Sequence, residues 1–225
     1  MSLNFVFLLI LFAAFCHAGW STIVKKSGNG LAIMAMTSII EIIIFLPLVF
    51  TVPLPSTNIW FFIFATTILH GFYRYSVITS YKYGDLSFVY PIARGGSVLI
   101  IGLISLLIIE SNISVLGVIG ILLICFGLFM ISFLTARKFN RIAFIIAITT
   151  ASLIATYTIL DGMAVRRSEN GFTFIYWMLL LNGIPMLVYA LLSKNGLRKK
   201  NSYNLIDGIV AGILAILGYG LVVWS

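Results

Sequence analysis

Ionisable side chains inside long apolar segments are the first candidates for chemistry in this 225-residue chain. Arg94 belongs to "FVYPIARGGSVLII", and Glu41 belongs to "TSIIEIIIF". A charge at the centre of a membrane helix costs roughly 2.5–3.5 kcal/mol on insertion scales, so a sequence keeps one there for a function or within an ion pair. Each such residue is therefore interpreted as part of a functional site or of a structural pair.

Arg94 is the strongest of these candidates. It lies about one helical turn after Pro91 and its neighbour Tyr90, and two glycines follow it. Proline frees a backbone carbonyl group of the preceding turn, and glycines let a neighbouring helix approach closely. A kinked or broken helix that carries a cation suits an anionic group of a ligand. The alternatives are that Arg94 extends to the membrane interface or pairs with a buried acid such as Glu41.

Glu41 has no ionisable neighbour three or four residues away on its helix. A single acid at that depth is a candidate for proton coupling. The other interpretation is a packing residue that is protonated or paired with an arginine. No cofactor is predicted, and the proton is the one coupling ligand that the sequence suggests.

A second group of polar and aromatic residues has helical spacing. His70 and Arg74 lie four residues apart in "LHGFYRY", with Tyr73 beside them, and His17 and Trp20 lie in "FCHAGW". Residues at i and i+4 share a helix face, so these side chains could line a cavity and contact a solute. Alternatively, Arg74 reaches lipid headgroups and each histidine is a packing residue.

Two aspartates and two glycine pairs complete the set of candidates. Asp161 in "YTILDGM" is expected at the end of a helix, where it lies either in the pathway or in the boundary region. Asp85 precedes an apolar run and is predicted to cap a helix, which stabilises it by roughly 1 kcal/mol. Helix-packing positions are predicted at four glycines, namely Gly117, Gly120, Gly208 and Gly212.

The residues give no motif of an enzyme or of a metal site. Neither "HExxH" nor "GxSxG" nor two intramembrane aspartates that face one another is found. Cys16 and Cys125 lie inside apolar segments without metal-ligand spacing, and both are interpreted as packing residues.

The composition, 61% apolar and 9% charged, is typical of an all-α integral membrane protein and not of a soluble domain. The first segment resembles a signal peptide but lacks a basic start, so it is interpreted as a membrane helix that is retained. At roughly 20 residues per crossing, the apolar runs predict a polytopic bundle of eight transmembrane helices, over about 3–22, 32–52, 59–79, 88–109, 113–134, 142–163, 172–192 and 206–224.

The net charge of +8 is distributed over short loops, which fits lipid headgroups and membrane topology better than nucleic acid. Arg166 and Arg167 are the two basic residues of the even-numbered loops. This asymmetry predicts an N-terminus outside the cytoplasm, and the expected location is the cell (inner) membrane, as a multi-pass protein. The odd-numbered loops carry Lys25, Lys26, Lys82, Arg137, Lys138, Arg141, Lys194, Arg198, Lys199 and Lys200.

An internal repeat organises these helices. "VKKSGNG" at 24–30 matches "VRRSENG" at 165–171, "LP" at 46–47 matches "IP" at 184–185, and "LHGFY" at 69–73 matches "ILGYG" at 216–220. Because five helices separate the copies, the second copy is expected to be inverted, as in many secondary transporters. The repeat predicts a five-helix first copy over 1–135 and an incomplete, three-helix second copy over 141–225.

Four stretches resemble the EamA-like transporters of the drug/metabolite transporter superfamily. They are "FCHAGWSTIVKKSG", "YKYGDLSFVYPIARGG", "ATYTILDGMAVRRS" and "NGIPMLVYALL". The resemblance implies a ten-helix bundle of two inverted five-helix repeats, which moves small metabolites or drugs across the membrane by alternating access. Relative to that pattern, this sequence is expected to lack the last two helices.

The resemblance and the residues together predict a secondary transporter or exporter of small organic solutes. The alternative is a truncated remnant without transport, or a membrane subunit that needs a partner. An intramembrane enzyme is the least favoured class. The predicted partners are the lipid bilayer, a small-molecule solute, and either a second copy of the chain or another chain that supplies the missing helices.

Overall fold

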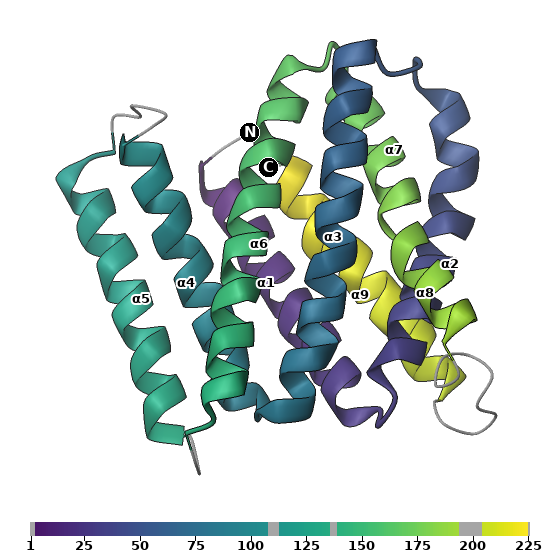
Figure 1. The fold of residues 1–225 in the computed structure, drawn as a ribbon. Coiled ribbons are helices and arrows are strands. Elements are labelled where there is room, and N and C mark those ends of the chain that lie inside the picture. Colours follow the sequence, from purple (N-terminus) through teal and green to yellow (C-terminus); the bar gives the residue numbers. More distant parts are fainter. Residues whose placement is uncertain (1–2, 108–112, 136–138, 194–203, 225) are drawn as a thin grey trace. The chain divides into compact units, whose positions relative to one another are not determined.

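The computed structural model describes residues 3–107, 113–135, 139–193 and 204–224. Within these ranges the regular structure is helical and no strand is found (Figure 1). Eight segments of this described part are long and apolar enough to cross a membrane. The prediction of an all-α, multi-pass membrane protein is therefore confirmed.

The helices follow the predicted spans in order, and the seventh span consists of two helices. Residues 49–51 extend α2 as a short 3₁₀ helix, η1 (Val49–Thr51). The α-helices are α1 (Leu3–Lys26), α2 (Gly30–Leu48), α3 (Thr57–Tyr83), α4 (Leu86–Leu107), α5 (Val115–Thr135), α6 (Arg141–Arg167), α7 (Gly171–Asn182), α8 (Ile184–Leu192) and α9 (Leu205–Trp224).

Two helices extend beyond the predicted spans. Both α3 and α6 have 27 residues, roughly 40 Å at 1.5 Å per residue, because the backbone helix continues through polar residues after the apolar run has ended. The predicted ends at 79 and 163 were therefore too early. The last two residues of the predicted span 88–109 lie outside the described residues, as do six basic residues used for topology, Arg137, Lys138, Lys194, Arg198, Lys199 and Lys200.

The two copies of the repeated loop motif begin their helices in the same way. The side chain of Asn29 accepts a hydrogen bond from the Ala32 amide at 3.1 Å and starts α2. The side chain of Asn170 accepts one from the Phe172 amide at 2.9 Å and starts α7. Asparagine at this position satisfies an amide that has no partner within the helix. Asp85 directly precedes α4, and its carbonyl oxygen accepts from the amides of Phe88 and Val89.

The helices divide into two compact units, which are described separately. Unit 1 contains residues 1–74 and 160–225, and unit 2 contains residues 75–159. The helices α3 and α6 contribute to both units. In unit 1, α9 packs along α1 and α2, and α7 and α8 pack against α2 (Figure 1). Its apolar core includes Phe45, Ile63, Phe174 and Met178.

Unit 2 is held together by close helix contacts at small residues. A Cβ atom added at Gly95 would lie 3.2 Å from Leu128 of α5, and one at Gly96 would lie 2.9 Å from Ala151 of α6. The hydroxyl groups of Ser76 and Thr150 lie 2.6 Å apart and join α3 to α6. The predicted close approach at the two glycines that follow Arg94 is therefore confirmed.

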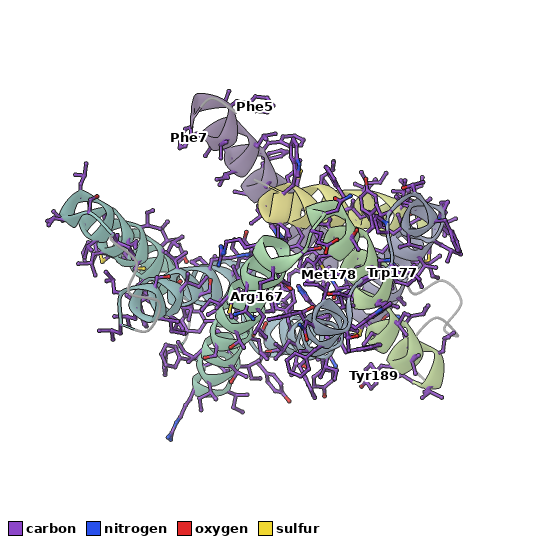
Figure 2. All side chains as sticks on the ribbon, turned by 90° about the horizontal axis from the view of Figure 1, so that it is seen from above. Phe5, Phe7, Arg167, Trp177, Met178 and Tyr189 are labelled. Carbon is purple, nitrogen blue, oxygen red and sulfur yellow. The ribbon has the colours of Figure 1, made fainter. Side chains whose placement is uncertain are left out.

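Large apolar side chains cover the outer surface of α1. Figure 2 shows Phe5 and Phe7 at the start of this helix pointing away from its neighbours in unit 1. The exposed fraction of Phe7 is 61%. Exposed apolar surface of this extent suits contact with lipid acyl chains and not with water.

The glycines of α9 form a packing surface against α2. A Cβ atom at Gly208 would lie 2.7 Å from Met36, and one at Gly212 would lie 2.8 Å from the Cβ atom of Ile40. The predicted packing role of this pair is confirmed. The same prediction is wrong for Gly120 of α5, where an added Cβ would have no described neighbour within 4 Å.

We expect Gly212→Val to reduce the free energy of unfolding by about 1–3 kcal/mol, because the branched side chain collides with Ile40 at a point where neither helix backbone can yield. Gly120→Val introduces the same residue into another membrane helix and is the matched control, with an expected change below about 0.5 kcal/mol. Unfolding of the detergent-solubilised protein, followed by circular dichroism, measures both. Equal losses in the two variants would contradict the packing role of Gly212.

Candidate functional site

A group of polar side chains lies in the interior of unit 1. It is called the polar cluster below and joins four helices, α2, α3, α6 and α9. Four of its members are almost completely buried, and the fifth, a tyrosine, is half-buried. The cluster consists of Glu41, His70, Arg74, Asp161 and Tyr219.

Glu41 and Arg74 form an ion pair between α2 and α3. The Nη2 atom of Arg74 donates to Oε1 of Glu41 at 2.5 Å, and its Nη1 atom donates to the Ser38 hydroxyl at 3.1 Å. Glu41 is 1% exposed and Arg74 is 4% exposed. The guanidinium group thus neutralises the acid inside the bundle, and the alternative that Arg74 reaches lipid headgroups is wrong.

The second carboxylate oxygen of Glu41 lies at a break between α7 and α8. A Cβ atom at Gly183 would lie 2.8 Å from this Oε2 atom and 2.7 Å from the Cβ atom of Ser38, so only glycine fits there. The break follows from Pro185, which has no amide hydrogen to continue the helix from Leu181. Gly183 keeps helical dihedral angles, with φ −77° and ψ −22°, so α7 and α8 form one span that Pro185 interrupts locally, and this point lies directly against the ion pair.

Helix α3 also approaches this break closely. A Cβ atom at Gly71 would lie 2.9 Å from the Cβ atom of Pro185. Gly71 follows His70 in the sequence, so the same turn of α3 contacts both the break and the second half of the polar cluster.

Asp161 is the centre of that second half. Its Oδ2 atom accepts a hydrogen bond from the hydroxyl group of Tyr219 and lies 3.4 Å from Nε2 of His70. Asp161 is 1% exposed, and α6 continues to Arg167 beyond it. The expectation that Asp161 ends its helix is therefore wrong, because the helix extends through the following glycine to the arginine pair.

Aromatic rings surround these polar groups. The ring centroids of Trp20 and Tyr73 are 6.4 Å apart in a stacked arrangement. His70 lies 5.0 Å from the ring of Tyr219 and 6.3 Å from that of Tyr73, with the rings edge to face in both cases. His17 lies 6.5 Å from Tyr219. The five rings come from α1, α3 and α9.

The structure thus brings seven predicted residues together in unit 1, on α1, α2, α3 and α6. Tyr219 was not among the candidates. The only signal for it was its place in "ILGYG", which matches the "LHGFY" that contains His70. The residues brought together are His17, Trp20, Glu41, His70, Tyr73, Arg74 and Asp161.

Three further candidates belong to unit 2. The guanidinium carbon of Arg94 lies 5.6 Å from the ring centroid of Tyr90, within the range of a cation–π contact. Pro91 is buried in α4, which continues without interruption from Leu86 to Leu107. A break at Pro91 is therefore wrong, and the interrupted span is α7 with α8.

In the part of the chain that the structure describes, no metal site and no disulfide is found near the polar cluster. Among the described residues, no three His, Cys, Asp or Glu side chains lie close enough to hold a metal ion. Cys16 and Cys125 are both free and buried. The Cys125 thiol donates to the carbonyl oxygen of Gly95 at 3.3 Å, which fits a packing role.

No family model, curated protein or solved structure matches this chain. The resemblance to the EamA-like transporters stays a prediction from the four stretches that carry it.

We expect Glu41→Gln and Arg74→Gln each to reduce the free energy of unfolding by about 3–5 kcal/mol, because each leaves its partner buried without a counter-charge. The double variant removes both charges and is expected to lose less than the sum of the two single variants. Lys82→Gln, at an exposed position near the end of α3, is the control. Additive losses in a double-mutant cycle would contradict the coupling between Glu41 and Arg74.

Proposed function

We propose that this chain is a secondary transporter that moves a small organic solute across the membrane by alternating access. The observation that carries this proposal is the position of the polar cluster, buried in a membrane bundle and in contact with an interrupted helix. Many secondary transporters bind their solutes at locally interrupted transmembrane helices, and here the interruption at Pro185 lies against the buried carboxylate of Glu41.

Open polar atoms at the cluster support a solute site. The Glu41 Oε2 atom, the Asp161 Oδ1 atom and the side-chain oxygen of Asn182 are buried and have no hydrogen-bond partner among the described residues. Asn182 is the last residue of α7, directly before the break at Gly183. Buried polar groups normally have partners, so a bound solute or water that supplies hydrogen-bond donors fits these three acceptors.

The aromatic rings around the cluster add a second kind of contact. Trp20 and Tyr73 present flat, partly apolar surfaces next to the charged groups, which suits an organic solute that has both a polar and an apolar part. Small metabolites and drugs have this character. The resemblance of the sequence to the EamA-like branch of the drug/metabolite transporter superfamily supports the same class of solute.

The repeat supports the proposed mechanism. Inverted repeats allow one half of a transporter to adopt the inward-open form while the other adopts the outward-open form. The equivalent helix caps at Asn29 and Asn170 agree with two copies of one structural unit. The proposed location is the cell (inner) membrane, where the distribution of basic residues favours an N-terminus outside the cytoplasm.

Arg94 is proposed as a further position of the solute pathway, in α4. We expect Arg94→Ala to slow solute flux about tenfold, equivalent to about 1.4 kcal/mol, because the cation that attracts an anionic group is removed. Arg94→Lys is expected to retain part of the flux, since it keeps the charge and loses the planar guanidinium group.

Flux into liposomes that contain the purified protein measures this effect. A panel of labelled anionic, cationic and zwitterionic solutes is compared with empty liposomes, and Lys82→Ala serves as the control for a lost exposed charge. If the wild type moves none of the solutes, the transport proposal fails. If Arg94→Ala moves every transported solute as fast as the wild type, only the role of Arg94 fails.

A further inference from the structure

The charges of the polar cluster do not balance. The cluster contains two acids, Glu41 and Asp161, and one permanent cation, Arg74, whose guanidinium group donates to Glu41 and Ser38. The basic group in contact with Asp161 among the described residues is the imidazole of His70. With neutral histidine and both acids ionised, the cluster carries one uncompensated negative charge inside a membrane bundle.

A net charge at this depth is costly, so one more positive charge is required. Glu41 does not need it, because arginine stays protonated in proteins and already neutralises this acid. Asp161 does need it. Its Oδ2 atom is occupied by His70 and the Tyr219 hydroxyl group, and its Oδ1 atom has no hydrogen-bond partner in the described part of the chain.

The groups that face Asp161 come from three other helices. His70 of α3 and Tyr219 of α9 contact Asp161, and His17 of α1 lies beyond the tyrosine ring. Around His70, Tyr73 lies on the same helix, and Glu41 of α2, which is paired with Arg74, interacts with it electrostatically. On α6 itself, Arg166 is exposed and extends along Gly162. Imidazole is the group in this set whose ordinary titration range includes neutral pH.

We propose that Asp161, His70 and Tyr219 form a proton-binding site that holds one exchangeable proton. The proton is held between the imidazole of His70 and the carboxyl group of Asp161, whose Oδ1 oxygen has no hydrogen-bond partner among the described residues, and no other bond forms or breaks. Tyr219 donates its hydroxyl proton to Oδ2 in both forms and holds the carboxyl group in place.

This site supplies a coupling ion for the transporter proposed above, and that use of the proton rests on the proposed function. Proton uptake from water on one side of the membrane and release on the other would then accompany the solute cycle. We therefore place proton coupling at Asp161, whereas the sequence alone suggested Glu41. Proton binding itself does not depend on transport and is tested without a solute.

The test follows proton binding in the full chain reconstituted in lipid bilayers. The chain contains two histidines, so a His17→Gln variant assigns the ring signals of His70 in ¹⁵N-histidine solid-state NMR. Infrared difference spectra report the carbonyl stretch of a protonated carboxylic acid. On acidification, we expect the wild type to gain one proton, seen in the His70 ring or in a carboxyl band.

Three variants decide where this proton binds. Asp161→Asn is expected to lose the pH-dependent change, because an isolated imidazole in an apolar interior has no anion to offset the charge of a bound proton. Asp85→Asn, the matched control at an exposed aspartate, is expected to keep it. The Glu41→Gln, Arg74→Gln double variant, which removes the ion pair as a unit, is also expected to keep it.

The proposal is overturned if the wild type shows no pH-dependent change. It is also overturned if the change persists in Asp161→Asn or is lost in the Glu41→Gln, Arg74→Gln double variant. Circular dichroism and size-exclusion chromatography report whether each variant folds. If Asp161→Asn does not fold, His70→Gln gives the decision in its place. The pH-dependent change is then expected to be lost or to appear only in the carboxyl band of Asp161, and a change at any other group overturns the proposal. Solute flux does not enter these measurements, so this proposal and the transport proposal fail independently.

Discussion

The cost of burying charge in a membrane governs the arrangement of unit 1. Glu41 lies in the middle of an apolar helix, and a carboxylate there is tolerated only with a counter-charge and hydrogen-bond donors. Arg74 supplies both, at 2.5 Å from the acid. This pair determines which turns of α2 and α3 lie opposite each other. The remaining polar groups follow from that register, because His70 lies one turn before Arg74 on the same helix.

Small residues make this register sterically possible. Gly183 lets the break between α7 and α8 lie against Glu41 and Ser38, and Gly71 lets α3 approach Pro185. On the other side of α2, Gly208 and Gly212 of α9 leave room for Met36 and Ile40. Glycine is selected at each of these positions by the space available and not by its backbone freedom. The apolar packing and the polar cluster therefore depend on the same close helix contacts.

The sequence predicted the individual helices well and their ends less well. Hydropathy is a local property, so eight apolar spans were visible without any knowledge of their neighbours. The ends of α3 and α6 were missed because a backbone helix continues into polar residues once its hydrogen bonds have begun. The break in the seventh span was also missed. It depends on a glycine and a proline that follow an asparagine within an apolar run, and hydropathy averages over such a short signal.

For the site, the sequence alone placed Glu41, His70, Arg74 and Asp161 in predicted membrane spans, and it left open whether Arg74 and Asp161 lie in the interior or at the boundary. It also determined that the protein is an all-α, multi-pass membrane protein. Only the tertiary structure decided the partner of each charge. Glu41 and Arg74 are separated by 33 residues, and His70 and Asp161 by 91, so their contacts depend on how distant helices pack. Pairing at such separations results from packing of the whole bundle, and no local pattern in the sequence records it.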